Sequence, residues 1–409
     1  MMTILRKILF LLLSSYVVFP AEAEHYQSIN KGRILFYNIL SEERSEMEVS
    51  FRGTSWDAVS NEYAETITVP ETVEKAGKIY SVVSVSNDAF RDCKTLKKVV
   101  LPASVRKVGS RAFKDCVSLT SVSFPSSLDS LHESVFDGCR SLASVTLPDS
   151  LSSIEPFVFR GCVYLERLEL PRNLTSFHPS CVDNCSALKT ISVDSLNDDY
   201  SDLEGLLYNK QQTALVRCPE GKAEVSLPSN LQGLGEYSMR GCTLLTDLYL
   251  PRIFYAGNYA LSGCTGLRSI TIPSSLSYVS EGMLRGCTSL DSVMLSKSTV
   301  SVRDKAFENC NGLRFVDTPA LIEIGRAAFR NCSALSSFSF PSSLKTIGDE
   351  AFSGCVNLLF LNVATKTPAM CGEGVFDPRI TYKAALTVPA GTLPDYRKAA
   401  GWQAIYNIR

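Results

Sequence analysis

The stretch AFKDCVSLTSVSFPSSLDSL at Ala112–Leu131 decides the fold, because most of the chain repeats it. The shared pattern is A-F-x-x-C-x-x-L-x-x-V-x-L-P-x-x-L-x-x-I, and a later copy begins AFSGCVNLLFLNV at Ala351. Eleven cysteines mark the copies at intervals of 22 or 23 residues, with a single interval of 57: Cys93, Cys116, Cys139, Cys162, Cys185, Cys242, Cys264, Cys287, Cys310, Cys332 and Cys355. A period of this length is typical of a solenoid in which each copy forms one coil.

The positions of the pattern predict the structure of one coil. Val122 and Phe124 alternate with polar residues, which predicts a short strand with one buried face. Pro125 follows directly and ends the strand, since proline has no N–H for a ladder. The Ser, Gly and Asp residues after it predict a turn-rich return path, with room for one helical turn near the Ala-Phe pair. Stacked coils would then bury a continuous core behind a parallel sheet with one strand per coil.

The strand-and-proline pattern also finds coils that lack the cysteine. These are Ile67–Val69, Val225–Leu227 and Leu386–Val388, each followed by proline. They bring the expected sheet to 14 strands, or about 60 Å at ~4.8 Å between strands. The long interval then holds one coil enlarged by 11 residues at about 194–224, and its GLLYNKQQTALVRCPEG at Gly205–Gly221 predicts a β-hairpin that bulges from the solenoid.

The two ends of the repeat need covers, because an open solenoid end exposes core and ladder. The expected parts are a β-rich N-terminal cap over 24–66, a leucine-rich-type solenoid over 67–364 and a C-terminal cap over 365–409. GRILFYNIL and MEVSF predict strands at Gly32–Leu40 and Met47–Phe51 in the first cap. In the second cap we expect a short amphipathic helix and a last strand, with Trp402 and Tyr406 over the final coil.

The first 23 residues have the pattern of an export signal. Arg6 and Lys7 precede the apolar run Ile8–Phe19, which is short for a membrane span. Ala21–Ala23 then provides a small-x-small cleavage site, so the mature chain would begin at Glu24. The alternative is a membrane anchor. We predict an exported protein, secreted or at the cell surface and with the periplasm also open, that has no transmembrane segment after cleavage.

Fourteen cysteines in an exported protein would suggest disulfides, but the spacing favours another interpretation. Cysteines in one column are stacked core residues, and bridging adjacent coils would twist the ladder, so we expect reduced, buried thiols. His178, Cys181 and Cys185 resemble a zinc-binding group, yet Cys181 falls in the column that is Ala elsewhere and no second ligand pair is near. Cys218 and Cys371 are off-register, and these are the thiols we expect to be exposed or bridged.

The composition excludes several classes of function. A net charge of −1 with well-mixed charges gives no electrostatic case for nucleic acid. The three histidines form no catalytic spacing with Ser or Asp, and no phosphate loop or H-E-x-x-H motif occurs. We therefore expect no enzyme, no catalytic residue, no cofactor and no metal site.

The chain resembles the BspA-like leucine-rich repeat proteins of bacterial surfaces. The resemblance rests on the repeated A-F-x-x-C-x-x-L-x-x-V-x-L-P, on GLLYN…TALVRCPEGK and on the ending LTVPAGTLPDYRKAAGWQAIYNI, and it covers nearly the whole mature chain. It implies a curved solenoid at the cell surface or exported, and in some members adhesion to host matrix proteins or other cells.

The outward strand positions show where a partner would bind. Most are Ser or Thr, but the C-terminal half carries apolar exceptions, and aromatic and Met side chains are enriched at binding hot spots. The alternative is that these side chains pack on each other or under a cap. The candidate partner-binding face comprises Tyr249, Met294, Phe315, Phe360, Asp247 and Asp317.

These observations predict an exported leucine-rich repeat protein that mediates protein–protein interaction or adhesion. Its partner would be a host matrix or cell-surface protein, or a component of the bacterial envelope. The alternative is a structural or glycan-associated scaffold of the envelope without adhesin activity. Asp-Ser-aliphatic triplets at 129–131, 149–151 and 194–196 also resemble the O-glycosylation motif of Bacteroides-type exported proteins.

Overall fold

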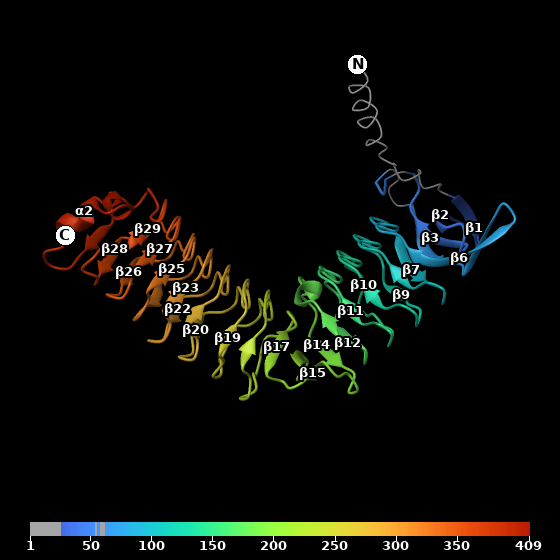
Figure 1. Ribbon diagram of the computed structural model, residues 1–409, viewed down its shortest axis with the longest axis horizontal. Helices are drawn as coiled ribbons and strands as arrows, with labels where there is room; N and C mark the ends of the chain where they lie inside the picture. The colour runs from blue at the N-terminus through green and yellow to red at the C-terminus, as the bar shows by residue number, and fades with distance from the viewer. Residues whose placement is uncertain (1–25, 54, 58–61) are drawn as a thin grey trace, which may run out of the picture.

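The chain folds into a curved solenoid, as the repeat predicts. The structure is a computed structural model that describes residues 26–53, 55–57 and 62–409. The first strand and the last helix lie at opposite ends of an arc and on the same side of it (Figure 1). The predicted export signal and the cleavage site at Ala21–Ala23 lie outside the described residues. Within the described residues, no helix has both the length and the apolar character needed to cross a membrane.

The predicted strands form the first of two parallel ladders. Most of them end at or before a proline and alternate buried with exposed side chains, as in β12, where Leu168 and Leu170 are buried between exposed residues. The strands are β4 (Glu65–Thr68), β7 (Leu96–Val100), β9 (Ser121–Ser123), β12 (Arg167–Leu170), β14 (Thr190–Val193), β20 (Ser269–Thr271), β22 (Ser292–Met294), β24 (Phe315–Asp317), β26 (Ser337–Phe340), β28 (Phe360–Val363), β30 (Ala385–Thr387) and β31 (Asn407–Ile408).

This first ladder is not the continuous sheet that the sequence predicts. It consists of four separate sheets. The segments 144–147, 225–227 and 247–249 do not pair as regular strands and separate the first three sheets, and a further break separates β24 from β26. Leu147 and Leu248 in these segments are nevertheless buried. The alternation of apolar side chains therefore continues where the hydrogen-bonded ladder is interrupted.

A second ladder runs through the segment that we predicted to be only a turn-rich return path. Its strands are mostly two residues long, and in all of them but β29 the apolar end of the pattern is buried, as at Leu131 and Ile154. A two-residue strand is too short to show alternation in a sequence. The strands are β6 (Lys78–Val85), β8 (Lys107–Val108), β10 (Ser130–Leu131), β11 (Ser153–Ile154), β13 (Ser176–Phe177), β17 (Ala214–Arg217), β18 (Gly233–Leu234), β19 (Tyr255–Ala256), β21 (Tyr278–Val279), β23 (Ser301–Val302), β25 (Glu323–Ile324), β27 (Thr346–Ile347) and β29 (Met370–Cys371).

Stacked turns close the third side of each coil and lie along the inner side of the arc (Figure 1). The Phe113 N–H donates to the Val135 carbonyl oxygen of the next coil at 2.9 Å, and Asp115 does the same to Asp137 at 2.7 Å. The residue before each of the eleven column cysteines has a φ between 59° and 79°. This left-handed region favours Gly, Asn and Asp, which are the residues found there. The one helical turn in this region, η1 (Pro179–Val182), is a 3₁₀ turn in a single coil.

The core follows the Phe and Cys columns along the arc. Phe90, Phe113, Phe136 and Phe159 stack in sequence with ring centroids 5.0–5.7 Å apart. The buried apolar residues form two clusters, one from the N-terminal end and one from the C-terminal end, which meet within β16 (Leu206–Asn209). The enlarged coil therefore lies at the junction of the two halves.

The enlarged coil contains the predicted antiparallel hairpin, but the hairpin does not bulge from the solenoid. β15 (Tyr200–Leu203), β16 and β17 form a three-stranded meander, and β17 then pairs in parallel with β18 of the second ladder. Leu206 and Leu215 are buried. The hairpin packs into the stack because this removes the surface of its apolar residues from water.

Strands cover the N-terminal end and a helix covers the C-terminal end. The first strands are β1 (Tyr26–Asn30), β2 (Arg33–Ser41), β3 (Glu46–Ser50) and β5 (Thr72–Lys75), of which β3 joins the second ladder through β6. At the other end lie α2 (Leu393–Lys398) and the 3₁₀ helix η2 (Trp402–Ala404). Trp402 is fully buried with its ring centroid 5.2 Å from that of Phe340, as expected, whereas Tyr406 is 65% exposed and does not cover the coil.

Candidate binding surfaces

The cysteine column is a set of hydrogen-bonded, buried thiols. In nine of the eleven coils the Sγ–H donates to a carbonyl oxygen in the preceding coil at 2.9–3.4 Å, as from Cys139 to Phe113. The accepting carbonyl oxygen belongs to the residue three positions before the cysteine of the preceding coil. Burial raises the pKa of the Cys93 and Cys310 thiols to about 12. Protonated, buried thiols are poor nucleophiles, so this column stabilises the fold.

The two off-register cysteines differ from each other. Cys218 is fully buried and unbridged, so the expectation of an exposed or bridged thiol is wrong for it. Its backbone N–H donates to Ser238 at 2.6 Å, which ties the enlarged coil to the next one. Cys371 in β29 is unbridged and partly exposed, and burial of its thiol raises the pKa to about 12.

The residues that resembled a zinc-binding group have other partners. Cys185 donates to the Phe159 carbonyl oxygen at 3.1 Å, and Cys181 is fully buried. His178 caps η1, where its Nδ1 accepts from the Ser180 N–H and lies 2.7 Å from the Ser180 hydroxyl. Ser180 is only 2% exposed, so this Ser–His pair offers no access to a substrate. Among residues 26–53, 55–57 and 62–409, no group of three or more His, Cys, Asp or Glu side chains is placed to hold a metal ion.

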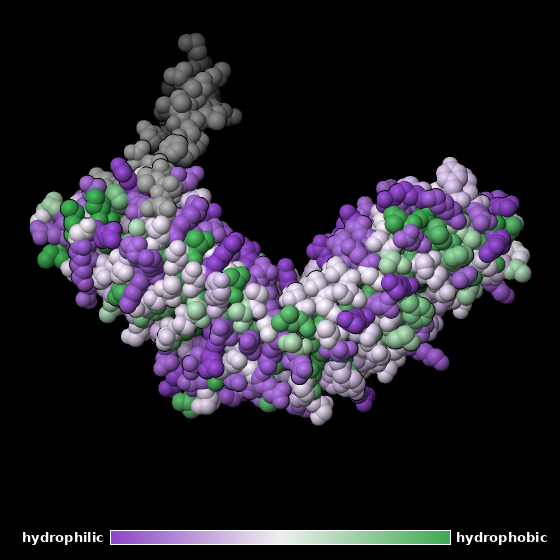
Figure 2. All heavy atoms as spheres, turned by 180° about the vertical axis from the view of Figure 1, so that it is seen from behind, coloured by the Kyte–Doolittle hydropathy of each residue, from purple (hydrophilic) through white to green (hydrophobic). Residues whose placement is uncertain are grey.

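The candidate partner-binding face lies on the outward side of the first ladder, and we call it the strand face. Tyr249 is 84% exposed, and Met294, Phe315 and Phe360 are 43–56% exposed. They therefore do not pack under a cap. Figure 2 shows apolar side chains from behind as separate patches along the arc, with polar surface between them.

The strand face divides into neighbouring groups. β22 and β24 bring Met294 directly beside Asp317, while Phe315 lies beside Ser292. Phe360 is two strands further along, beyond Ser337 of β26. Hollows open at both acidic positions, one lined by Asp247 and Tyr249 and the other by Phe315 and Asp317. The six residues thus form an extended surface with hollows in place of one compact pocket.

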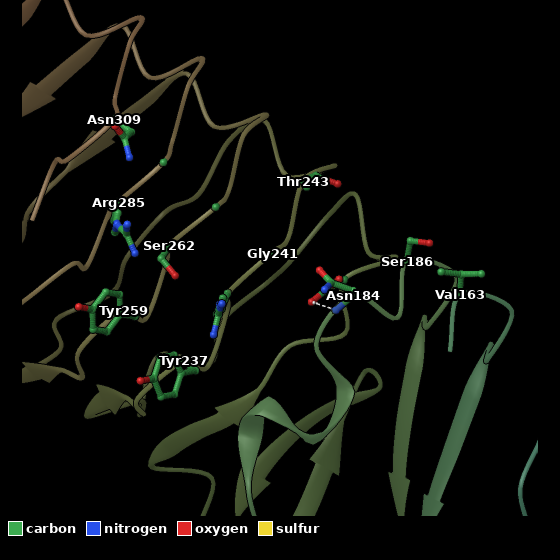
Figure 3. A pocket seen from close by; sticks show the side chains of 14 residues that line it. Val163, Asn184, Ser186, Tyr237, Gly241, Thr243, Tyr259, Ser262, Arg285 and Asn309 are labelled. Atoms are coloured by element: carbon green, nitrogen blue, oxygen red, sulfur yellow. Dashed lines mark hydrogen bonds between the residues drawn. The ribbon is translucent and has the colours of Figure 1, made fainter. Parts of the chain in front are cut away.

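Two other surface features could not be predicted from the sequence. Tyr382 and Tyr406 stack at the C-terminal end with ring centroids 4.2 Å apart, and both are largely exposed. A groove of about 780 Å³ crosses the stacked turns beside the enlarged coil, from Val163 to Asn309 (Figure 3). We call it the central groove. Its residues belong to different columns of several coils, which no single motif brings together.

The structure separates the three Asp-Ser-aliphatic triplets. Leu131 and Leu151 are fully buried, and the Ser150 hydroxyl donates to the Leu128 carbonyl oxygen at 2.5 Å. Ser195 is exposed and is followed by Leu196, which is 63% exposed. Of the three, the triplet at 194–196 is the one whose serine and aliphatic side chain are both open to solvent.

Comparisons with known proteins agree with this geometry. The family profile described as BspA type leucine rich repeat region matches six times, over residues 83–202, 222–323 and 315–378. No curated protein sequence matches the chain.

Several solved structures share the fold. A leucine-rich repeat protein from Bacteroides ovatus is 24% identical, with 93% of this chain and 98% of that chain covered and a TM-score of 0.55. One from Eubacterium ventriosum is 20% identical, with 84% and 92% covered and a TM-score of 0.62. A leucine rich cell surface protein from Faecalibacterium prausnitzii is 21% identical, with 84% and 96% covered and a TM-score of 0.54.

Proposed function

The chain belongs to the BspA type leucine-rich repeat proteins, and from that premise we propose that it is an exported binding protein whose strand face holds a protein partner. The partner is a host matrix or cell-surface protein, or a protein of the bacterial envelope. The expected export signal and the surface location of a similar fold from Faecalibacterium prausnitzii support the placement outside the cell.

The observation that carries this proposal is the exposure of large apolar side chains on the strand face. Phe315 and Phe360 stand 52% and 56% exposed among positions that are mostly Ser or Thr. Burying such a ring at an interface would contribute about 2 kcal/mol. Asp317 beside Met294 adds a charged group at the rim, and such a group favours one orientation of a partner.

We propose that the protein acts by binding a partner and not by catalysis. A solenoid displays its side chains along an extended surface, which suits recognition of a large partner. In the Ser–His pair at η1, Ser180 is buried and His178 acts as the cap. The remaining alternative is an envelope scaffold without adhesin activity.

The test compares the mature chain from Glu24 with a strand-face variant, Tyr249→Ser/Met294→Ser/Phe315→Ser/Phe360→Ser. Serine occupies equivalent positions in other coils, so the variant should fold. Surface plasmon resonance against immobilised fibronectin, laminin and collagen should show binding that the variant loses.

A matched control carries Tyr164→Ser/Leu244→Ser, which removes exposed apolar side chains from the turn side and should bind normally. Equal binding by the strand-face variant would refute the placement of the site. Absence of binding to every matrix protein, together with co-sedimentation of the chain with isolated envelopes, would favour the scaffold.

A further inference from the structure

The central groove has a floor that lacks side chains. Gly241, Gly263 and Gly286 follow one another in the column before the cysteines, with φ between 73° and 77°. Asn184 and Asn309 occupy the same column at the two ends of the groove. Three consecutive coils without a Cβ therefore leave a depression on the inner side of the arc, with a wider side chain at each end.

A buried carboxylate stands at this floor. Glu220 lines the groove yet is only 7% exposed, and its Oε1 accepts from Arg217 and from the Asn184 N–H, both at 2.9 Å. No donor among the described residues reaches its Oε2. A Cβ at position 241 would lie 2.6 Å from the carboxylate, so glycine is needed there for Glu220 to reach the floor. Oε2 thus remains able to form a hydrogen bond with a ligand of the groove.

Two stacked tyrosines form one wall. The Tyr237 and Tyr259 rings lie with centroids 5.6 Å apart and planes 15° from parallel (Figure 3). The Tyr259 hydroxyl donates to Glu281 at 2.9 Å, which fixes the ring. A Cβ at position 282 would lie 2.2 Å from that ring, so Gly282 lets it lie flat on the next coil. The wall is therefore a rigid aromatic surface with polar edges.

The charges around the groove are balanced. Arg240 pairs with the buried Asp183 at 3.1 Å, and Arg285 pairs with the buried Glu308 at 2.6 Å. Each lining arginine is therefore paired with a carboxylate, so the lining of the groove carries no unpaired arginine to attract an anionic ligand. The guanidinium groups keep further N–H donors for a neutral acceptor.

The groove also lacks what an extended peptide needs. The N–H groups of Gly241 and Gly263 already donate to the next coil at 2.9 and 2.7 Å, so no main-chain edge is free for strand addition. Val163 is the single aliphatic side chain among the lining residues, which gives a peptide side chain no apolar pocket. The lining instead supplies hydroxyl, amide and guanidinium groups beside aromatic rings.

We propose that the central groove binds a neutral oligosaccharide that lies along the solenoid. Its hydroxyl groups form hydrogen bonds with Glu220 Oε2 and accept from the arginines and asparagines, and the C–H groups of a sugar ring contact the edges of the stacked Tyr237 and Tyr259 rings. The groove crosses six coil steps, so at ~4.8 Å per step the ligand spans up to about 29 Å. This site lies on the stacked turns, so it does not depend on the strand face.

The test fills the floor with a residue that the chain itself uses in this column. Gly263→Asn/Gly286→Asn is compatible with the positive φ, because Asn309 and Asn331 hold φ values of 63° and 61° in consecutive coils. The added Cβ atoms meet only Cα and N atoms of the preceding glycine, at 3.8–3.9 Å. The matched control is Gly161→Asn, whose Cβ is equally free but lies three coil steps from Gly241, beyond Asn184.

Calorimetric titration uses the mature protein with neutral hexasaccharides of glucose, mannose, xylose and galactose, and with an anionic galacturonic acid hexasaccharide. At least one neutral sugar should bind, and the floor variant should weaken its binding at least about ten-fold. Gly161→Asn and the strand-face variant should bind it normally. Circular dichroism and the urea midpoint show whether each variant is folded.

Three results would overturn the proposal. One is that no neutral sugar binds at millimolar concentration. Another is that the folded floor variant binds as the parent does. The third is that the floor variant loses only the anionic sugar, or loses only the binding of a matrix protein.

Discussion

Replacing one column cysteine by alanine or by serine shows whether the buried thiol stabilises the fold by apolar packing alone or also by its hydrogen bond. Cys139 is fully buried, and its Sγ–H donates to the Phe113 carbonyl oxygen at 3.0 Å. Cys139→Ala removes a buried group of methylene size, about 1 kcal/mol, and leaves a small cavity, about 0.5 kcal/mol. It also removes a weak hydrogen bond, about 0.5 kcal/mol. We therefore expect a destabilisation of about 2 kcal/mol.

Cys139→Ser should cost less, under about 1 kcal/mol, because the hydroxyl can donate to the same carbonyl oxygen. If the column were only apolar packing, the order would be reversed, since a buried hydroxyl without a partner costs about 1–3 kcal/mol. The predicted order of stability is Cys, then Ser, then Ala.

Urea unfolding followed by circular dichroism measures the order through the shift in midpoint at unchanged slope. Cys371→Ala is the control, because Cys371 is partly exposed and outside the column. It should change the midpoint little. A serine variant less stable than the alanine variant at position 139 would refute the hydrogen-bonding role of the thiols.

Three further predictions follow from the same contacts. Cys371 should be alkylated first by iodoacetamide in the native protein, since the other thirteen cysteines are buried, and peptide mass spectrometry would contradict this if a column cysteine reacted as fast. Burial raises the pKa of Glu220 from 4.5 to about 7 against the opposing effect of Arg217, so the folded state holds the proton more tightly. The stability it contributes, about 3 kcal/mol, is present below pH 4.5 and lost as the pH rises to 7. Glu220→Gln should reduce the dependence of the urea midpoint on pH over this window, and an unchanged dependence on pH would count against this role of Glu220. Trp402→Ala should cost about 3–5 kcal/mol, because the ring is fully buried and its Nε1 donates to Ala369 at 2.8 Å; hydrogen exchange should show the loss confined to the last coils.

Much of the fold could be predicted because the same pattern recurs in many copies along the chain. The alternation at Val122 and Phe124, the proline after it and the spacing of the cysteines predicted the coil, the first ladder and the buried thiols. The second ladder was missed because two-residue strands such as Ser130–Leu131 carry too little alternation to recognise.

The binding surfaces divide in a similar way. Exposure of the apolar residues on the strand face followed from the inward and outward alternation of one strand. The central groove could not be predicted, because it depends on contacts between coils. Glu220 lines the groove from the enlarged coil, and it has room there because Gly241 has no Cβ.

The strand face as the partner site is tested most directly by hydroxyl-radical footprinting of the mature protein with and without a bound matrix or envelope protein. Tyr249, Met294, Phe315 and Phe360 are exposed and of reactive types, so their oxidation can be followed residue by residue. We predict that the partner slows oxidation at these four residues and leaves exposed Tyr164 unchanged. Unchanged oxidation of the four, with protection elsewhere on the solenoid, would contradict a partner site on the strand face.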